Sequence, residues 1–270
     1  MTIWMISGLH DSRWLENIVD NYARQTYEEK NLVLIENGNG LGRAADDARL
    51  VGGDDSHDRV EGVVVMQSGP GPAQPLNAAL LWLRTHAAPN DWFAKCDSDD
   101  YYGPEYLNSI TRAIEAGADY AGRSSLYIRT TDNRLWYVEG NPDAYVFHGP
   151  TIAGKITSSC DFPVVNDWGE DAEWCLQMRA AGRVPCVLPA EGVCYQRWGN
   201  YCHTWPCTDF EIRTSWSATF HDLGEFDRDV VDGKKLKPLG VTLEAPEFSV
   251  ENSMAVRVLM EKLGREVHLQ

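Results

Sequence analysis

Short apolar runs alternate with stretches of helical periodicity over the first 120 residues, and this alternation restricts the fold more than any other feature of the chain. The runs that predict strands are residues 3–7, 31–35, 62–66 and 92–97. The apolar spacing that predicts helices occupies residues 14–22, 76–83 and 104–117. Strands joined by helices pair in parallel through right-handed crossovers. The sequence therefore predicts an α/β fold with a Rossmann-like, nucleotide-binding half over residues 1–120.

The pattern changes after residue 120. Residues 120–145 are rich in Tyr, Thr and Arg and contain a turn signal at Asp132–Arg134, which predicts antiparallel strands and hence a mixed sheet. A helix is predicted over residues 170–181. We expect residues 221–248 to be loop-like and residues 249–264 to form a terminal helix.

Three acids lie at the end of the strand predicted at residues 92–97, namely Asp97, Asp99 and Asp100. Carboxylates held this close repel one another and lose hydration, so such a cluster at a strand end usually needs a cation. Ligands of open α/β sheets bind outside the carboxyl ends of the strands. We therefore predict a divalent cation here; the alternative is a solvated turn or helix start without an ion.

Composition restricts the class of protein. The formal net charge of -16 argues against a protein that binds nucleic acid or an anionic membrane over a broad face, because such binding needs a basic surface. The sequence has no run of 18 apolar residues, and its start lacks the features of a signal peptide. The 7 cysteines are an odd number without CxxC spacing, which favours free thiols. We expect a soluble, cytoplasmic protein without a membrane span; the oligomeric state stays open.

Five motifs occur in a fixed order: QTY at residues 25–27, ENG at 36–38, Asn77 in PLNAAL, DSDD at 97–100 with Pro104 after it, and GEDAEWCLQMRAAG from Gly169. Their order and spacing resemble those of the family 2 glycosyltransferases of the GT-A fold, from the first strand to about residue 205. The resemblance implies a Rossmann-like nucleotide-binding half with a mixed central sheet, plus an acceptor-binding half. It also implies transfer from a nucleotide sugar to a hydroxyl acceptor, with inversion at the anomeric carbon.

The resemblance divides the chain into a GT-A domain over residues 1–220 and a C-terminal extension over residues 221–270. Within the domain, residues 1–120 would bind the nucleotide sugar and residues 121–220 would bind the acceptor and carry the catalytic group. The sequence of the loops in the acceptor-binding half does not indicate which acceptor they bind.

DSDD corresponds to the DXD motif of the family, which implies Mn²⁺ or Mg²⁺ as cofactor. Asp99 would be the direct metal ligand, and Asp97 would reach the ribose or hold a metal-bound water. Ser98 belongs to the same donor-binding loop, and Asp100 would orient the cluster without touching the ion. A cation here would stabilise the charge that develops when a nucleoside diphosphate departs.

Glu170 and Asp171 are the predicted catalytic pair. The resemblance makes Asp171 the general base that removes the proton of the acceptor hydroxyl. A helix N-terminus lowers the pKa of a carboxylate, so burial or a nearby diphosphate has to offset that effect. The alternative is that both acids only complement the helix dipole.

His203 is a candidate third metal ligand, because several GT-A enzymes supply a late histidine to the metal. The alternatives are a hydrogen-bonded structural histidine, or a small zinc site with Cys194, Cys202 and Cys207, which their irregular spacing disfavours. The aromatic residues Trp198, Tyr201 and Trp205 are candidates for stacking on an acceptor sugar or for core packing.

Donor contacts are predicted for Ser7, Gly8, Glu36 and Asn77. Glu36 stands where the family usually has an aspartate, and could accept a hydrogen bond from a uracil imide. A UDP-sugar is the expected donor, with GDP and dTDP as alternatives. Two other functions stay open: a sugar-1-phosphate nucleotidyltransferase, although the first strand ends in SGLHDSR without a lysine, and a non-catalytic protein that binds sugar nucleotides or carbohydrate.

Overall fold

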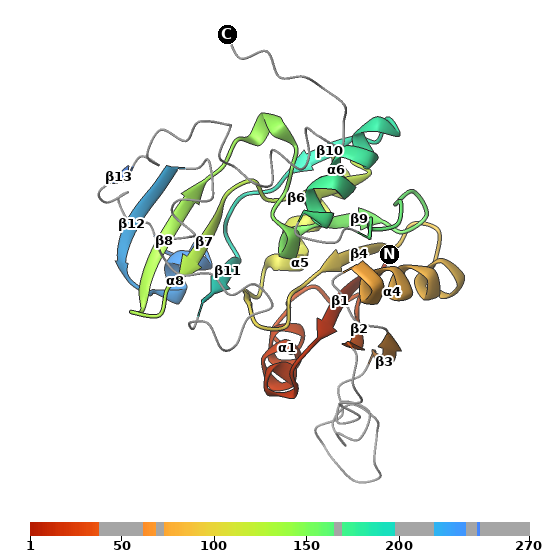
Figure 1. The fold of residues 1–270 in the computed structure, drawn as a ribbon, viewed down its shortest axis with the longest axis horizontal. Coiled ribbons are helices and arrows are strands. Elements are labelled where there is room, and N and C mark those ends of the chain that lie inside the picture. Colours follow the sequence, from red (N-terminus) through yellow and green to blue (C-terminus); the bar gives the residue numbers. More distant parts are fainter. Residues whose placement is uncertain (38–61, 69–72, 165–168, 198–218, 236–241, 244–270) are drawn as a thin grey trace.

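Two sheets, of seven and six strands, organise the molecule (Figure 1). The computed structural model describes residues 1–37, 62–68, 73–164, 169–197, 219–235 and 242–243. Among the helices in these ranges, none combines the length and the apolar character needed to cross a bilayer. The predicted terminal helix at residues 249–264 lies outside the described residues.

The seven-stranded sheet has the order β10-β6-β9-β4-β1-β2-β3. Its strands are β1 (Ile3–Leu9), β2 (Lys30–Asn37), β3 (Val63–Ser68), β4 (Trp92–Lys95), β6 (Tyr120–Gly122), β9 (Ala153–Lys155) and β10 (Pro185–Val187). The pairs β1–β2, β1–β4 and β2–β3 are parallel, as the helical connections predict. Strand β9 runs antiparallel to both β4 and β6, so the sheet is mixed. The predicted α/β fold with a mixed central sheet is confirmed.

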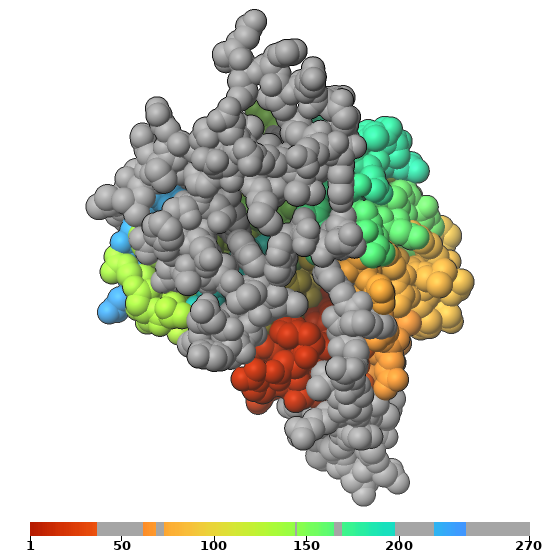
Figure 2. Space-filling view, in the orientation of Figure 1, coloured from red at the N-terminus to blue at the C-terminus, as the bar shows by residue number. Residues whose placement is uncertain are grey.

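Helices cover both faces of this sheet. On one face, α1 (Leu15–Ala23) and α5 (Tyr106–Glu115) pack on side chains that alternate along the strands, such as Met5 and Leu32. On the other face, α4 (Ala73–His86) and α6 (Glu170–Ala180) pack on Ile6, Val33 and Phe93. In the space-filling view, the orange surface of α4 continues into the green and teal surface around β9 and α6 (Figure 2). Both faces are apolar because β1, β2 and β4 are largely buried between two helical layers, whereas the edge strand β3 is half-buried.

The six-stranded sheet has the order β13-β12-β8-β7-β11-β5. Its strands are β5 (Tyr101–Tyr102), β7 (Leu126–Arg129), β8 (Arg134–Glu139), β11 (Val193–Gln196), β12 (Thr219–Glu225) and β13 (Thr242–Leu243). Strands β7 and β8 form the antiparallel hairpin expected from the turn signal, and Asn133 adopts the left-handed conformation in that turn (φ 63°).

The loop-like reading of residues 221–248 is wrong for the part that the structure describes. Strand β12 pairs with β8 from Thr219 to Glu225, and α8 (Arg228–Val231) buries Val230 and Val231. The stretch contains polar residues and Gly224, so its local pattern is that of a loop. Its strand character comes from backbone hydrogen bonds to β8, a segment that is distant in sequence, and such pairing has no local signature.

Candidate active site

The acidic loop begins where β4 ends, at Lys95, and leads into β5. The backbone N–H of Cys96 donates to the carbonyl of Ile6 in β1 at 2.9 Å, so the loop leaves the sheet beside the end of β1. The register of the parallel pair brings Leu9 in β1 opposite Glu36 in β2. The ends of β4, β1 and β2 therefore meet at one edge of the sheet, which is where open α/β folds bind ligands.

Three carboxylates gather at this edge. One oxygen from each of Asp97, Asp99 and Asp100 lies within 4.8 Å of the others. Asp99 and Asp100 are buried, whereas the side chain of Asp97 is 39% exposed. Burial raises the pKa of Asp97, and the charge of Asp99 raises it further. A cation near these groups would relieve both effects.

Asp100 is held by the second sheet. Its Oδ1 accepts hydrogen bonds from the backbone N–H of Gln196 at 2.9 Å and from Nη1 of Arg197 at 3.2 Å. Both residues lie at or just beyond the end of β11, so the ion pair joins the acidic loop to the six-stranded sheet. That Asp100 orients the cluster stays a prediction.

Two asparagines of α1 fix the backbone of the acidic loop. Asn17 donates from Nδ2 to the carbonyls of Ser98 at 2.7 Å and Asp100 at 2.8 Å. Asn21 donates to the Asp100 carbonyl at 2.8 Å and accepts from the N–H of Tyr102 at 3.0 Å. No sequence motif indicated either residue. The signal that could have found them is a pair of asparagines four positions apart in a helix that otherwise buries apolar side chains.

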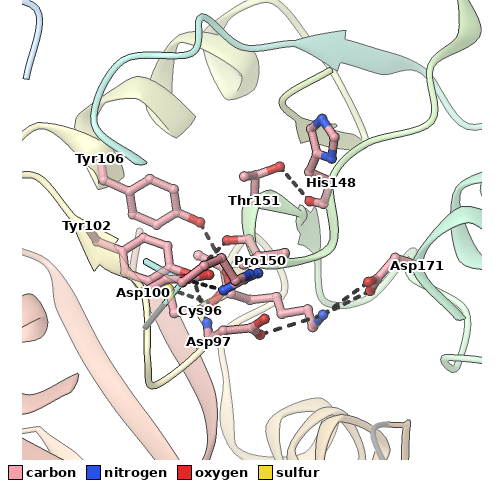
Figure 3. A network of polar contacts seen from close by, with 12 residues as sticks. Cys96, Asp97, Asp100, Tyr102, Tyr106, His148, Pro150, Thr151 and Asp171 are labelled. Carbon is pink, nitrogen blue, oxygen red and sulfur yellow. Dashed lines mark hydrogen bonds and ion pairs between the residues drawn. The ribbon is translucent and has the colours of Figure 1, made fainter. Parts of the chain in front are cut away.

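Asp171 lies in the first turn of α6 and faces the same site. Its two oxygens lie 3.0 and 3.3 Å from Nζ of Lys95, which is also 3.7 Å from Oδ1 of Asp97 (Figure 3). Burial disfavours the charged form of Lys95, but the charges of Asp171, Asp97 and Glu170 outweigh this and raise its pKa. Lys95 thus connects the predicted base with the acidic cluster, and no motif in the sequence indicated it.

The pKa of Asp171 is raised to about 7. Burial is the largest cause, the charges of Glu170 and Asp97 add to it, and the ammonium of Lys95 acts in the opposite direction. The lowering expected from the helix N-terminus is therefore more than offset. Glu170 itself is buried beside Asp171 at the start of α6. A carboxylate with a pKa near 7 exchanges protons readily at neutral pH.

The predicted donor contacts lie at two places. Ser7 and Glu36 are buried at the carboxyl-terminal parts of β1 and β2, and Gly8 follows Ser7 in β1. Asn77 in α4 uses its amide to donate to the carbonyl of Phe162 at 2.8 Å and to accept from the N–H of that residue at 2.7 Å. Asn77 thus has a structural role in holding Phe162, and its contact with a nucleotide stays a prediction.

Several predicted residues lie outside the described part of the chain. These are His203, Cys202, Cys207 and the aromatic residues Trp198, Tyr201 and Trp205. Within the described residues, the cysteines are free thiols, as expected: Cys96, Cys160, Cys175, Cys186 and Cys194.

The acidic cluster fits a hard divalent cation. Mg²⁺ and Mn²⁺ prefer oxygen ligands and are commonly held by one or two carboxylates, with phosphates and waters completing the shell. Asp100 pairs with Arg197, and Asp97 and Asp99 are the two carboxylates of the cluster that the sequence motif assigns to an ion. The partial exposure of Asp97 gives such an ion access from solvent.

No family model matches this sequence, and no curated protein matches it. Solved structures of S. aureus TarS match the fold. TarS residues 1–349 give a TM-score of 0.52 at 16% identity, over 73% of this chain and 60% of that chain. The same protein in complex with UDP-GlcNAc gives 0.51 at 17% identity, over 73% and 58%. This chain therefore spans about 60% of the length of TarS 1–349. Together with the mixed central sheet, these matches show that the chain has the GT-A fold of glycosyltransferases.

Proposed function

We propose that this chain is an inverting glycosyltransferase that transfers a sugar from a nucleotide sugar to a hydroxyl acceptor. The observation that carries the proposal is that one lysine nitrogen lies 3.0 Å from Asp171 and 3.7 Å from Asp97. The candidate base and the acidic cluster therefore face one site, as the reaction requires. If they lay in separate parts of the molecule, the sequence motifs would have no common chemistry.

Asp97 and Asp99 would hold Mn²⁺ or Mg²⁺, and Ser98 lies between them in the same loop. A bound ion would supply charge stabilisation for the diphosphate that leaves. Ser7, Gly8 and Glu36, at the ends of the adjacent strands, are the proposed contacts of the nucleoside, and Asn77 is kept as a proposed contact from α4. His203 stays a candidate third ligand.

Asp171 is the proposed general base. It takes the proton of the acceptor hydroxyl while that oxygen forms a bond to the anomeric carbon and the bond from this carbon to the diphosphate oxygen breaks. Attack on the face opposite the leaving group inverts the anomeric configuration. The pKa of about 7 keeps a substantial fraction of Asp171 ionised at neutral pH. Glu170 contributes through its charge, which raises the pKa of Asp171.

A UDP-sugar is the proposed donor. S. aureus TarS, which shares this fold, has been solved in complex with UDP-GlcNAc. The buried Glu36 at the end of β2 can accept a hydrogen bond from a uracil imide. UDP-GlcNAc is therefore the donor to test first, with GDP- and dTDP-sugars as comparisons.

The test measures hydrolysis of UDP-GlcNAc, with water as acceptor, in the presence and absence of Mn²⁺. We expect Mn²⁺-dependent hydrolysis that falls by about a factor of 100 or more in Asp171→Asn, since general base catalysis typically contributes that much. Glu173→Gln is the matched control, because Glu173 lies in the same helix and its side chain accepts a hydrogen bond from Gln177 in the next turn, away from Lys95. It should keep the activity.

Two results would contradict the proposal. Tight binding of the nucleotide sugar by a fully folded protein without any turnover would favour a non-catalytic binding protein. Formation of UDP-GlcNAc from UTP and the sugar 1-phosphate, with release of pyrophosphate, would favour a nucleotidyltransferase.

A further inference from the structure

We infer that Lys95 is the positioning residue for Asp171, and that Gly149 has no side chain because the Lys95–Asp171 pair occupies that space. The inference rests on the proposed function, since it concerns how the base of that reaction is held. It adds two residues, one from β4 and one from the turn before β9, which no sequence motif assigned.

The contact between Lys95 and Asp171 is nearly symmetric. The ammonium nitrogen lies 3.0 Å from Oδ1 and 3.3 Å from Oδ2, so it sits between the two oxygens of the carboxylate. A carboxylate has about four lone-pair sites. Two of them face Lys95, so this contact does not use the other two. The contact therefore fixes the plane of the group without using all of its basic positions.

Lys95 cannot easily move away from this position. Its side chain is only 9% exposed. Its backbone N–H donates to the carbonyl of Ile152 at 2.8 Å, and its carbonyl accepts from the hydroxyl of Tyr106 at 3.2 Å. A lysine on the surface would exchange between many rotamers, which weakens its hold on any partner. In Lys95, hydrogen bonds fix both the backbone N–H and the backbone carbonyl, and the side chain is buried.

Gly149 closes the other side of the pair. A Cβ at this position would lie 2.6 Å from Cγ of Asp171 and 2.9 Å from Nζ of Lys95, distances shorter than ordinary contacts. Gly149 is not among the described glycines with positive φ, so its backbone conformation is open to other residues. The requirement for glycine here comes from the close approach of the two charged side chains.

The turn that carries Gly149 is tied to the acidic loop. The N–H of Asp97 donates to the hydroxyl of Tyr102 at 2.7 Å, and this hydroxyl donates to the carbonyl of Pro150 at 3.0 Å (Figure 3). The hydroxyl of Thr151 donates to the carbonyl of His148 at 2.7 Å, which closes the turn. Gly149, Lys95 and the acidic loop thus form one connected support for Asp171.

The alternative role for Lys95 is to take part directly in binding the cation or the diphosphate. Its nitrogen is 3.7 Å from Asp97, a longer distance than either contact with Asp171. The two roles differ in kinetics: a group that positions the base affects kcat, whereas a group that binds the metal or the diphosphate affects the affinity for them.

The experiment compares Lys95→Met and Gly149→Ala with the unsubstituted protein in Mn²⁺-dependent hydrolysis of UDP-GlcNAc. We expect both variants to lower kcat about tenfold or more while KM for UDP-GlcNAc changes less than about threefold. Mn²⁺ affinity, measured by electron paramagnetic resonance of the free ion, should not weaken. Lys155→Met, a change of another lysine at the end of a strand of the same sheet, is the matched control and should behave as the unsubstituted protein.

Gly149→Ala tests the same contact without removing a charge, and circular dichroism checks that it is folded. The inference is overturned if both variants keep their kcat, or if Lys95→Met weakens Mn²⁺ binding or raises KM while kcat is retained. Absence of turnover in the unsubstituted protein would instead mean that the proposed function fails, and the inference would fall with it.

Discussion

At the scale of single residues, Asn21 shows how much of this site depends on side chains that carry no charge. It is fully buried, and its amide bonds the carbonyl of Asp100 and the N–H of Tyr102. Asn21→Ala would leave the buried N–H of Tyr102 without this acceptor, whereas the carbonyl of Asp100 would keep its hydrogen bond from Asn17. We expect the free energy of unfolding to fall by about 1–3 kcal/mol, measured by urea denaturation, and Mn²⁺ binding to weaken because the acidic loop is less ordered.

Asn108→Ala is the comparison for this prediction. Asn108 bonds the side chains of Thr26 and Glu105 near the surface. Its loss should change the unfolding free energy by about 1 kcal/mol or less. Equal effects of the two substitutions would show that the loop does not depend on Asn21.

His148 gives a second prediction at this scale, one of pH dependence. Burial lowers the pKa of His148 from 6.5 to about 4, and the neutral ring donates from Nε2 to the carbonyl of Ser124 at 2.9 Å. As pH falls below 6.5, the unfolded chain binds a proton at this residue and the folded chain does not. Its contribution to stability is therefore complete above pH 6.5 and decreases as pH falls toward 4.

The measurement is urea unfolding at pH 7 and pH 5, for the unsubstituted protein and for His148→Gln, which keeps a donor toward Ser124. Between these pH values the unsubstituted protein should lose about 1–2 kcal/mol more than the variant. Parallel pH dependences in the two proteins would exclude His148 as the cause.

At the scale of elements, the Asp100–Arg197 pair connects the acidic loop to strand β11 and therefore one sheet to the other. Both side chains are buried. Removing one member of a buried ion pair leaves the other charge buried without a partner, which is strongly destabilising. Replacing both members with uncharged residues avoids this cost. Arg197→Met should lower the unfolding free energy by about 3–5 kcal/mol, and adding Asp100→Asn should restore part of it.

A double-mutant cycle measures this coupling directly. The stabilities of the two single variants and of the double variant are compared with that of the unsubstituted protein. If the two effects simply add, the pair contributes no coupling and the sheets are held together by other contacts.

At the scale of the whole molecule, the net charge of -16 conflicts with the binding of an anionic nucleotide sugar. Local positive charge is needed, and in the described part of the site Lys95 and Arg197 are already paired with acids. We therefore expect UDP-GlcNAc to raise the melting temperature only when Mn²⁺ or Mg²⁺ is present, and EDTA to abolish the shift. A full shift in EDTA would show that the chain binds the donor without a cation.

How much of the fold the sequence predicted depended on the range of the interactions involved. The parallel core follows from apolar periodicity, which each segment carries by itself, and the hairpin of β7 and β8 follows from its turn residues. Strand β12 was missed because its strand character comes from its pairing with β8 and β13, which are separated from it in the sequence. The candidate site divides in the same way between local and long-range features. Its acidic residues can be recognised from the sequence. Four further residues are functional candidates only because of their contacts in the folded structure: Asn17, Asn21, Lys95 and Gly149.

The sequence by itself determined the alternation of strands and helices and the presence of carboxylates after β4 and at the start of α6, because periodicity and residue type are local properties. Only the tertiary structure decided that Lys95 lies between these carboxylates, that Arg197 neutralises Asp100, and that Asp171 has a pKa near 7. The physical reason is that distance and burial set the energies of charges, and both arise only when segments far apart in the chain pack together.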